Sequence, residues 1–125
     1  MYAHLVHREG LEPAPWCDLV SVVQYPDIDP ELAMAFGDAF SLDEGGALKL
    51  ADFAKRCGVN RALLKKGAAR MAELATEQAP LQAQAVEYLD DERAFANQLR
   101  DFIVGQASRL TALASEAAKV KDEFR

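Results

Sequence analysis

The sequence predicts a mostly helical chain that begins with a small β-hairpin. Half of its 125 residues are hydrophobic, and alanine, the strongest helix former, makes up most of the surplus. After residue 41, apolar residues recur at three- and four-residue spacing, as on one face of a helix. Before that residue, short β-prone runs alternate with glycine and proline. We therefore expect a single domain over residues 1–125, with the hairpin in residues 1–40 and a helical bundle in residues 41–125.

The hairpin is predicted from two short apolar runs near the N-terminus. Residues 3–7 and 11–16 are its expected strands, and the turn between them contains Gly10, which can adopt the positive φ that a tight turn needs. Pro13 and Pro15 lack a backbone N–H group. The second strand must therefore lie at an edge of the sheet or leave it there.

The residues after the hairpin are predicted to form another β-prone run and two turns. Residues 19–23 favour a strand, and residues 25–30 favour a loop in which Asp27 and Asp29 form turns between two prolines. Residues 31–40 are expected to be a short strand or a turn, because a glycine interrupts their apolar pattern.

Two helices are predicted between residue 41 and residue 80. The first begins at Ser41, which is expected to form a capping box with Glu44, and it ends near Gly58. The second begins at Asn60, a favourable N-cap, and Pro80 closes it. The buried face of the second helix is expected to hold Leu63, Leu64, Ala68, Met71 and Leu74.

The third predicted helix is the longest and runs from about Asp90 toward Val120. The acidic side chains of residues 90–92 suit its first turn, where carboxylates interact favourably with the helix dipole. An apolar seam at helical spacing predicts one buried face. It comprises Phe95, Leu99, Phe102, Ile103, Leu110, Leu113, Ala117 and Val120.

Composition excludes several classes of protein. A net charge of −6 disfavours indiscriminate binding to nucleic acid. No stretch approaches the roughly 20 apolar residues of a membrane span, and the first residues lack the pattern of a signal peptide. Cys17 and Cys57 form neither a disulfide framework nor a zinc pattern, so both are expected to be buried small residues. His4 and His7 fall on opposite faces of a strand, which disfavours a joint metal site. We therefore expect a cytoplasmic protein.

Asp18 is the strongest candidate for a functional residue. It ends a short apolar run that follows the predicted hairpin and two prolines. This placement is typical of a carboxylate held rigidly at the mouth of a site, as the metal-binding aspartate is in kinase-like folds. The alternative is a structural role, in which Asp18 caps the strand by accepting hydrogen bonds from neighbouring backbone amides.

The residues around Asp18 resemble those of a known family. Residues 11–22 are similar to the leucine-x-proline-x-tyrosine-aspartate-leucine segment of the HipA-type serine/threonine kinases, the toxins of bacterial toxin–antitoxin modules. The resemblance continues through Tyr25-Pro26, through residues 32–37 and through the helix that ends in a glycine at residues 52–59. It covers roughly residues 2–75.

The resemblance implies the helical C-terminal lobe of a kinase-like fold. It also implies that Asp18 binds the Mg²⁺ that bridges the phosphates of ATP, so Asp18 is both the expected metal ligand and the expected cofactor residue. The family's glycine-rich loop, lysine, catalytic aspartate and asparagine would precede Met1. No catalytic residue is therefore expected in this chain, and no phosphoryl transfer by the chain alone. Trp16-Cys17 departs from the family's pattern, which has tyrosine before the aspartate.

The resemblance also implies partners, while the residues themselves leave two other functions open. An antitoxin protein would regulate the parent kinase, whose acceptor would be a serine or threonine hydroxyl of a protein. Alternatively, residues 50–64 have helix-turn-helix character, and the lysines and arginines near the turn could contact DNA. Lysine and arginine side chains on a helix often form only its solvated face. The third helix could also be an interaction module for a partner or a second copy of the chain. The basic residues near the turn are Lys55, Arg56, Arg61, Lys65, Lys66 and Arg70.

Overall fold

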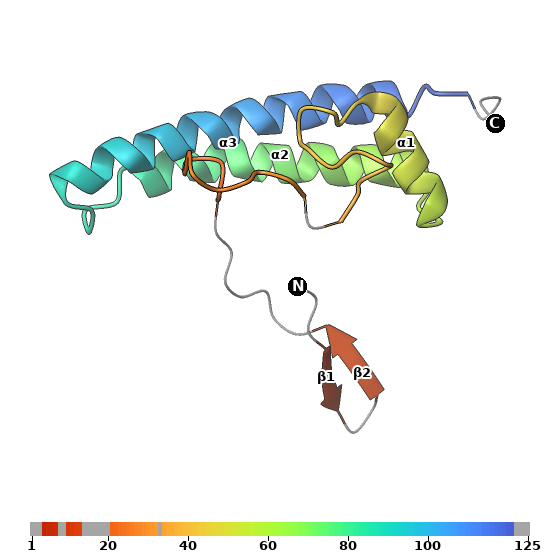
Figure 1. Cartoon of the computed structure of the whole chain (residues 1–125), viewed down its shortest axis with the longest axis horizontal. Helices are drawn as coiled ribbons and strands as arrows, with labels where there is room; N and C mark the ends of the chain where they lie inside the picture. Colours follow the sequence, from red (N-terminus) through yellow and green to blue (C-terminus); the bar gives the residue numbers. More distant parts are fainter. Residues whose placement is uncertain (1–3, 8–9, 14–20, 33, 122–125) are drawn as a thin grey trace.

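The described part of the chain contains three helices, of which two form a long antiparallel pair (Figure 1). The computed structural model describes residues 4–7, 10–13, 21–32 and 34–121. Helix α1 (Ala47–Arg56) lies across the end of the pair at which α2 (Arg61–Ala83) begins and α3 (Asp90–Ala117) ends. The mostly helical fold predicted from the sequence is therefore confirmed. None of the described helices is both long enough and apolar enough to cross a membrane.

Two short strands precede the helices. Strand β1 (His4–His7) pairs antiparallel with β2 (Gly10–Pro13), with His4 opposite Pro13 and His7 opposite Gly10. Within the described residues, neither strand packs against a helix (Figure 1). Residues 8 and 9, which would form the turn of the predicted hairpin, lie outside the described residues. The hairpin as a whole therefore stays a prediction.

The segment between the strands and α1 consists of turns. Residues 21–23 form no strand, so this described part of the predicted run 19–23 is wrong. The predicted turns at the two aspartates are confirmed, because Ile28 N donates to Tyr25 O across Asp27 (3.2 Å) and Glu31 N donates to Asp29 Oδ1 (3.0 Å). Residues 36–39 form a tight turn with positive φ at its two central positions, so the turn alternative for residues 31–40 is the correct one.

Helix α1 begins later than the capping signal predicts. Glu44 N donates to Ser41 Oγ (3.3 Å) and Phe40 N donates to Glu44 Oε2 (3.0 Å), so the two side chains close a turn rather than cap a helix. Gly45 and Gly46 follow, and two consecutive glycines disfavour helix, which explains why α1 starts only at Ala47. The predicted end is confirmed, because Gly58 has φ +66° just after the helix.

Helix α2 begins as predicted but continues past its proline. Asn60 Oδ1 accepts a hydrogen bond from Ala62 N (2.8 Å), which confirms the N-cap. Pro80 lies inside the helix, so the prediction that it closes the helix is wrong. A proline this near the C-terminal end removes a single donor, and packing against α3 maintains the last turn. The predicted buried face is also partly wrong, since Leu63 and Met71 are 63% and 61% exposed.

Helix α3 confirms the longest predicted element. Its first turn carries Asp90, Asp91 and Glu92, and Glu92 Oε2 accepts a hydrogen bond from Leu89 N (2.9 Å). The predicted seam is less buried than expected, because Phe95 and Leu110 remain exposed. The buried residues of α3 are alanines, and all of them lie in its C-terminal half: Ala107, Ala114 and Ala117. Small residues there allow α2 and α1 to approach α3 closely.

The core therefore lies at one end of the molecule, where α1 crosses the pair. Its buried residues are Leu50 and Ala51 of α1, Ala68 of α2, and Ala114 and Ala117 of α3. Partly buried apolar residues surround this cluster: Phe36, Ala47, Leu64, Leu113 and Val120. The ring of Phe36 stacks on Phe53 with centroids 4.5 Å apart, which fixes the turn at residues 36–39 against α1. Cys57 is exposed, so the prediction that it is buried is wrong.

Candidate functional site

Asp18, the predicted metal ligand, lies outside the described residues, as do Trp16 and Cys17. Its role therefore stays a prediction. Within residues 21–32 and 34–121 and the two strands, no group of three or more His, Cys, Asp or Glu side chains could hold a metal ion. Any such site at Asp18 would need further oxygen ligands from elsewhere, because Mg²⁺ prefers six.

The described residues that follow Asp18 lie against the N-terminal half of α3. Tyr25 N donates to Val22 O (3.0 Å), which folds this segment into a turn. The ring of Tyr25 then contacts that of Phe95 with centroids 6.1 Å apart and planes inclined by 43°. Aromatic pairs of this geometry contribute about 1 kcal/mol beyond the area they bury. The turn that ends at Tyr25 is therefore held at Phe95.

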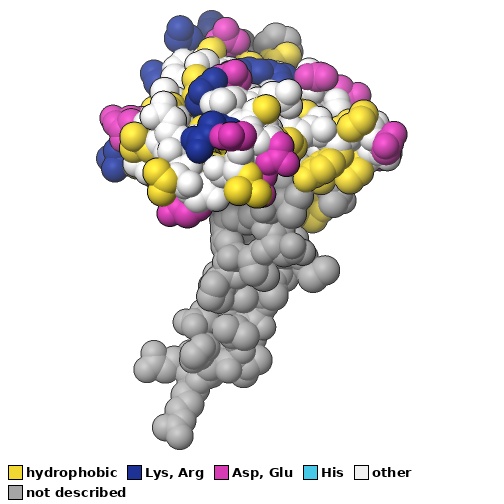
Figure 2. All heavy atoms as spheres, turned by 90° about the vertical axis from the view of Figure 1, so that its left-hand side faces the viewer, with side chains coloured by type: hydrophobic (Ala, Val, Ile, Leu, Met, Phe, Trp, Pro, Cys, Tyr) yellow, Lys and Arg dark blue, Asp and Glu magenta, His cyan; other side chains and the backbone are white. Residues whose placement is uncertain are grey.

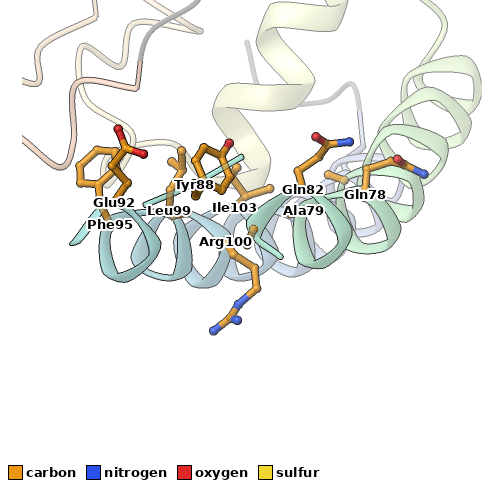
Figure 3. Close-up of a pocket in the computed structure, with 12 residues that line it drawn as sticks. Gln78, Ala79, Gln82, Tyr88, Glu92, Phe95, Leu99, Arg100 and Ile103 are labelled. Carbon is orange, nitrogen blue, oxygen red and sulfur yellow. The ribbon is translucent and has the colours of Figure 1, made fainter. Parts of the chain in front are cut away.

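Phe95 also lines a groove between α2 and α3, which we call the Phe95 groove (Figure 3). The cavity has a volume of about 570 Å³. Figure 3 shows the side chain of Arg100 pointing away from the other labelled residues, and its guanidinium bonds Asp101 (2.8 Å) and Asn97 (2.7 Å) instead. The lining is Ala75, Gln78, Ala79, Gln82, Ala83, Tyr88, Glu92, Phe95, Ala96, Leu99, Arg100 and Ile103. The groove is therefore mainly apolar, and sequence periodicity alone could not have shown that it stays open.

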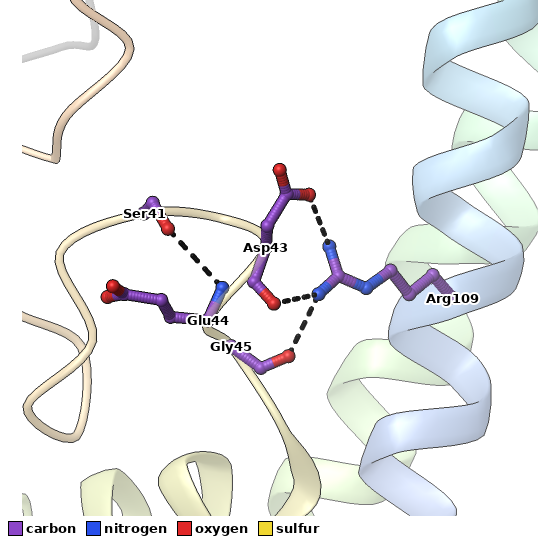
Figure 4. A network of polar contacts seen from close by, with 5 residues as sticks. All are labelled: Ser41, Asp43, Glu44, Gly45 and Arg109. Carbon is purple, nitrogen blue, oxygen red and sulfur yellow. Dashed lines mark hydrogen bonds and ion pairs between the residues drawn. The ribbon is translucent and has the colours of Figure 1, made fainter.

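Arg109 fastens the loop before α1 to α3 (Figure 4). One terminal nitrogen of its guanidinium, Nη2, donates to the backbone carbonyls of Asp43 (3.3 Å) and Gly45 (2.9 Å). The other, Nη1, lies 4.0 Å from the carboxylate of Asp43, which is fully exposed. A smaller cavity of about 290 Å³ lies beside this contact, lined by Phe36, Leu50, Arg109 and other residues. Sequence analysis missed this role of Arg109 because its partners are backbone atoms more than 60 residues away.

Three of the six basic residues of the suggested helix-turn-helix, all of them arginines, contact the protein itself. Arg56 bonds Asp38 (2.8 Å) and Asp52 (2.7 Å), and Arg70 bonds Glu73 (2.9 Å). Arg61 donates to the backbone carbonyl of Val120, three residues beyond the end of α3. A guanidinium held by a carboxylate is a weaker ligand for phosphate, because that partner must first be displaced. The geometry therefore does not favour DNA contacts by these three arginines.

Sequence and structure comparisons place the chain among known proteins. No family model matches it. It is 41% identical over 71 residues, or 57% of its length, to the serine/threonine-protein kinase toxin HipA of Shewanella oneidensis. It is 32% identical over 111 residues, or 85% of its length, to the putative kinase Y4mE of Sinorhizobium fredii. The matched parts are only 16% and 25% of these relatives, so the chain spans a quarter of their length or less.

A solved structure gives the same result for the fold. The structure of Shewanella oneidensis HipA with HipB and its operator DNA contains a chain that matches 96% of this one, with a TM-score of 0.86 and 30% sequence identity. The match covers 28% of that chain. The sequence and structural similarities agree with the motifs around Asp18, although they concern only part of each relative. The chain is therefore a HipA-type C-terminal domain.

Proposed function

We propose that this chain is the C-terminal lobe of a HipA-like serine/threonine protein kinase of a toxin–antitoxin system. One observation carries the proposal: the helical scaffold superimposes on HipA over 96% of the chain with a TM-score of 0.86 at 30% identity. In this role Asp18 binds Mg²⁺, and the bound Mg²⁺–ATP supplies the phosphoryl group. The helices form the rigid part of the lobe on which that aspartate is placed.

The contact between Tyr25 and Phe95 supports this role for the scaffold. It ties Tyr25, seven residues after Asp18 in the sequence, to a helix of 28 residues. A metal-binding carboxylate works best on a rigid support, because Mg²⁺ demands near-ideal octahedral geometry. A carboxylate is also the type of ligand that Mg²⁺ prefers. Asp18 would thus provide one oxygen ligand, while the nucleotide, water and other parts of the kinase provide the rest.

The chain on its own is proposed to be inactive. Phosphoryl transfer needs a positioned base, a metal and groups that hold the phosphates. The described residues contain no group of three metal-ligating side chains, and the family's catalytic loop has no counterpart among the residues matched by resemblance. A kinase assay with the 125-residue chain, ATP, Mg²⁺ and a generic protein substrate is expected to show no labelled product. Labelling above a no-enzyme control would contradict this part of the proposal.

The proposed partner is an antitoxin protein, and the proposed acceptor is a serine or threonine hydroxyl of a protein substrate. The solved relative was captured with HipB and operator DNA, which supports an antitoxin partner for a parent kinase of this type. Such a complex would act in the cytoplasm. Any contact with DNA would then be made mainly through the partner, because the arginines at the turn between α1 and α2 contact the protein itself.

The role of Asp18 is tested by Asp18→Asn in the product of the intact gene. Titration calorimetry with ATP, with and without Mg²⁺, measures the metal-dependent affinity. We expect Asp18→Asn to lower it about tenfold or more, which is ~1.4 kcal/mol of binding free energy. The matched control is Asp27→Asn, which removes the same charge nine residues later in an exposed turn.

Two readouts make the result unambiguous. Circular dichroism should be the same for both variants and the unchanged protein, since both residues precede the helices in the sequence. If Asp18→Asn binds Mg²⁺–ATP as tightly as Asp27→Asn, Asp18 is not the metal ligand. The structural alternative, in which Asp18 caps a strand, would then stand.

A further inference from the structure

The Phe95 groove lies at the end of the helix pair that the core does not reach. The buried residues of α3 begin at Ala107, so no residue that α3 contributes to the groove is buried. Figure 2 looks at the end of the molecule where α2 is joined to α3, and hydrophobic side chains are exposed there among charged ones. At the same end of the pair, in the last turn of α2 and in its connection to α3, Leu81, Val86 and Leu89 are 63%, 88% and 66% exposed. This combination of groove and exposed apolar residues is typical of a surface that contacts another protein segment.

A second groove between the same helices provides an internal comparison. It has a similar volume of about 540 Å³, and it is lined by Glu73, Thr76, Glu77, Ser108 and Thr111 together with three alanines. The pairing of α2 with α3 therefore does not by itself require an apolar lining. The polar groove suits water, whereas the Phe95 groove presents large apolar side chains that water solvates poorly.

The charges at the Phe95 groove indicate what kind of segment fits it. Arg100 points away from the groove and bonds its own helix (Figure 3). The carboxylate of Glu92 is engaged by the backbone N–H of Leu89 (2.9 Å). Glu92 keeps its negative charge, but its carboxylate already accepts this bond, and the rest of the lining that faces the groove is uncharged. An uncharged segment with apolar side chains would bury the apolar lining at the lowest cost, because it brings no charge of its own to be desolvated.

The position of the groove indicates where that segment comes from. Tyr25, seven residues after Asp18 in the sequence, packs on Phe95, so a segment that precedes the helices already reaches this surface. The matched HipA chain continues for nearly three quarters of its length outside the matched part. We propose that the Phe95 groove is the docking surface for the part of a HipA-type polypeptide that this chain does not span. The occupant is an uncharged apolar segment of that part. This inference rests on the proposed function as one lobe of a larger kinase.

Two neighbouring residues of α2 allow a matched test. Gln78 lines the Phe95 groove and Glu77 lines the polar groove, and both side chains are exposed. Gln78→Cys and Glu77→Cys are each made in the 125-residue chain and in the product of the intact gene. Maleimide labelling is followed with time by peptide mass spectrometry. Gln82→Cys, also in the Phe95 groove, serves as a second reporter.

The expected result is protection of one groove only. In the product of the intact gene, the thiols introduced by Gln78→Cys and Gln82→Cys should react roughly tenfold or more slowly than in the 125-residue chain, because labelling then requires local opening. The thiol introduced by Glu77→Cys should react at the same rate in both. Equal rates for Gln78→Cys in the two proteins would overturn the proposal. Protection in the 125-residue chain that grows with its concentration would also overturn it, since a second copy would then occupy the groove. Neither outcome depends on nucleotide binding, so this test can fail while the Asp18 assignment stands.

Discussion

Gly37 provides the sharpest test of how the loop before α1 is held. Its φ is +55°, in the left-handed region, and it faces the backbone of α1 at Lys49. A Cβ at this position would lie 2.8 Å from the carbonyl carbon of Lys49 and 2.9 Å from its Cα, with the carbonyl oxygen closer still. Helix backbone cannot move aside as a flexible side chain can. Gly37→Ala therefore combines backbone strain with a steric clash.

The magnitude follows from adding the two effects. A residue with a side chain in the left-handed region costs about 1–2 kcal/mol, and forcing extra atoms into a packed site costs typically about 1–3 kcal/mol. We expect Gly37→Ala to lower the free energy of unfolding by about 2–5 kcal/mol, a large part of the total for a small domain. The turn would separate from α1, and the stacking of Phe36 on Phe53 would be lost with it.

Two other glycines allow the cost of backbone strain to be measured without a steric clash. Gly58 also has a positive φ, but a Cβ there would meet nothing within 4 Å. Gly67 lies inside α2 with open space around it. In urea unfolding followed by circular dichroism, Gly58→Ala should cost only about 1–2 kcal/mol, and Gly67→Ala should stabilise by about 0.5–1 kcal/mol. If Gly37→Ala costs no more than Gly58→Ala, the close approach of the turn to α1 does not exist in solution.

Three further predictions concern the helices. Asn60→Ala should lower stability by about 1 kcal/mol through loss of the N-cap bond to Ala62 N, whereas Asn60→Asp should retain it. Leu50→Ala should cost about 2–4 kcal/mol because Leu50 is buried, while Leu63→Ala, at an exposed site, should cost far less; urea unfolding measures both pairs. Arg109→Met should speed amide hydrogen exchange in residues 41–46 several-fold while the exchange in α2 stays unchanged, because it removes the two bonds to loop carbonyls. Unchanged exchange in the loop would contradict the role of Arg109.

Local signals in the sequence were reliable where they act within one element. Asn60, Gly58 and the acidic residues 90–92 marked helix ends correctly, since capping and dipole interactions depend on nearby backbone. Ser41 and Glu44 also interact locally, but on a turn: Glu44 N donates to Ser41 Oγ as in a capping box, whereas the Glu44 carboxylate accepts from Phe40 N instead of Ser41 N. The two glycines that follow delay the helix, so a correct local interaction led to a wrong boundary.

Predictions of burial were less reliable because burial depends on which partner a face meets. Leu63 and Met71 follow helical spacing, yet the contacts of α2 are made through alanines such as Ala68 and Ala72. Pro80 was expected to end α2, but packing against α3 outweighs the loss of one hydrogen bond. Periodicity identifies an apolar face without identifying the neighbour that covers it.

For the candidate site, too, one part could be predicted from the sequence and another could not. The motif around Asp18 indicated the HipA-type family from the sequence alone, and the comparisons confirm that relationship. A motif can indicate a family because the chemistry of a site requires certain residue types at a fixed spacing in the sequence. The Phe95 groove and the attachment of the loop by Arg109 could be found only in the tertiary structure. Both depend on residues from different elements that packing brings together. A local sequence pattern does not indicate which elements will meet.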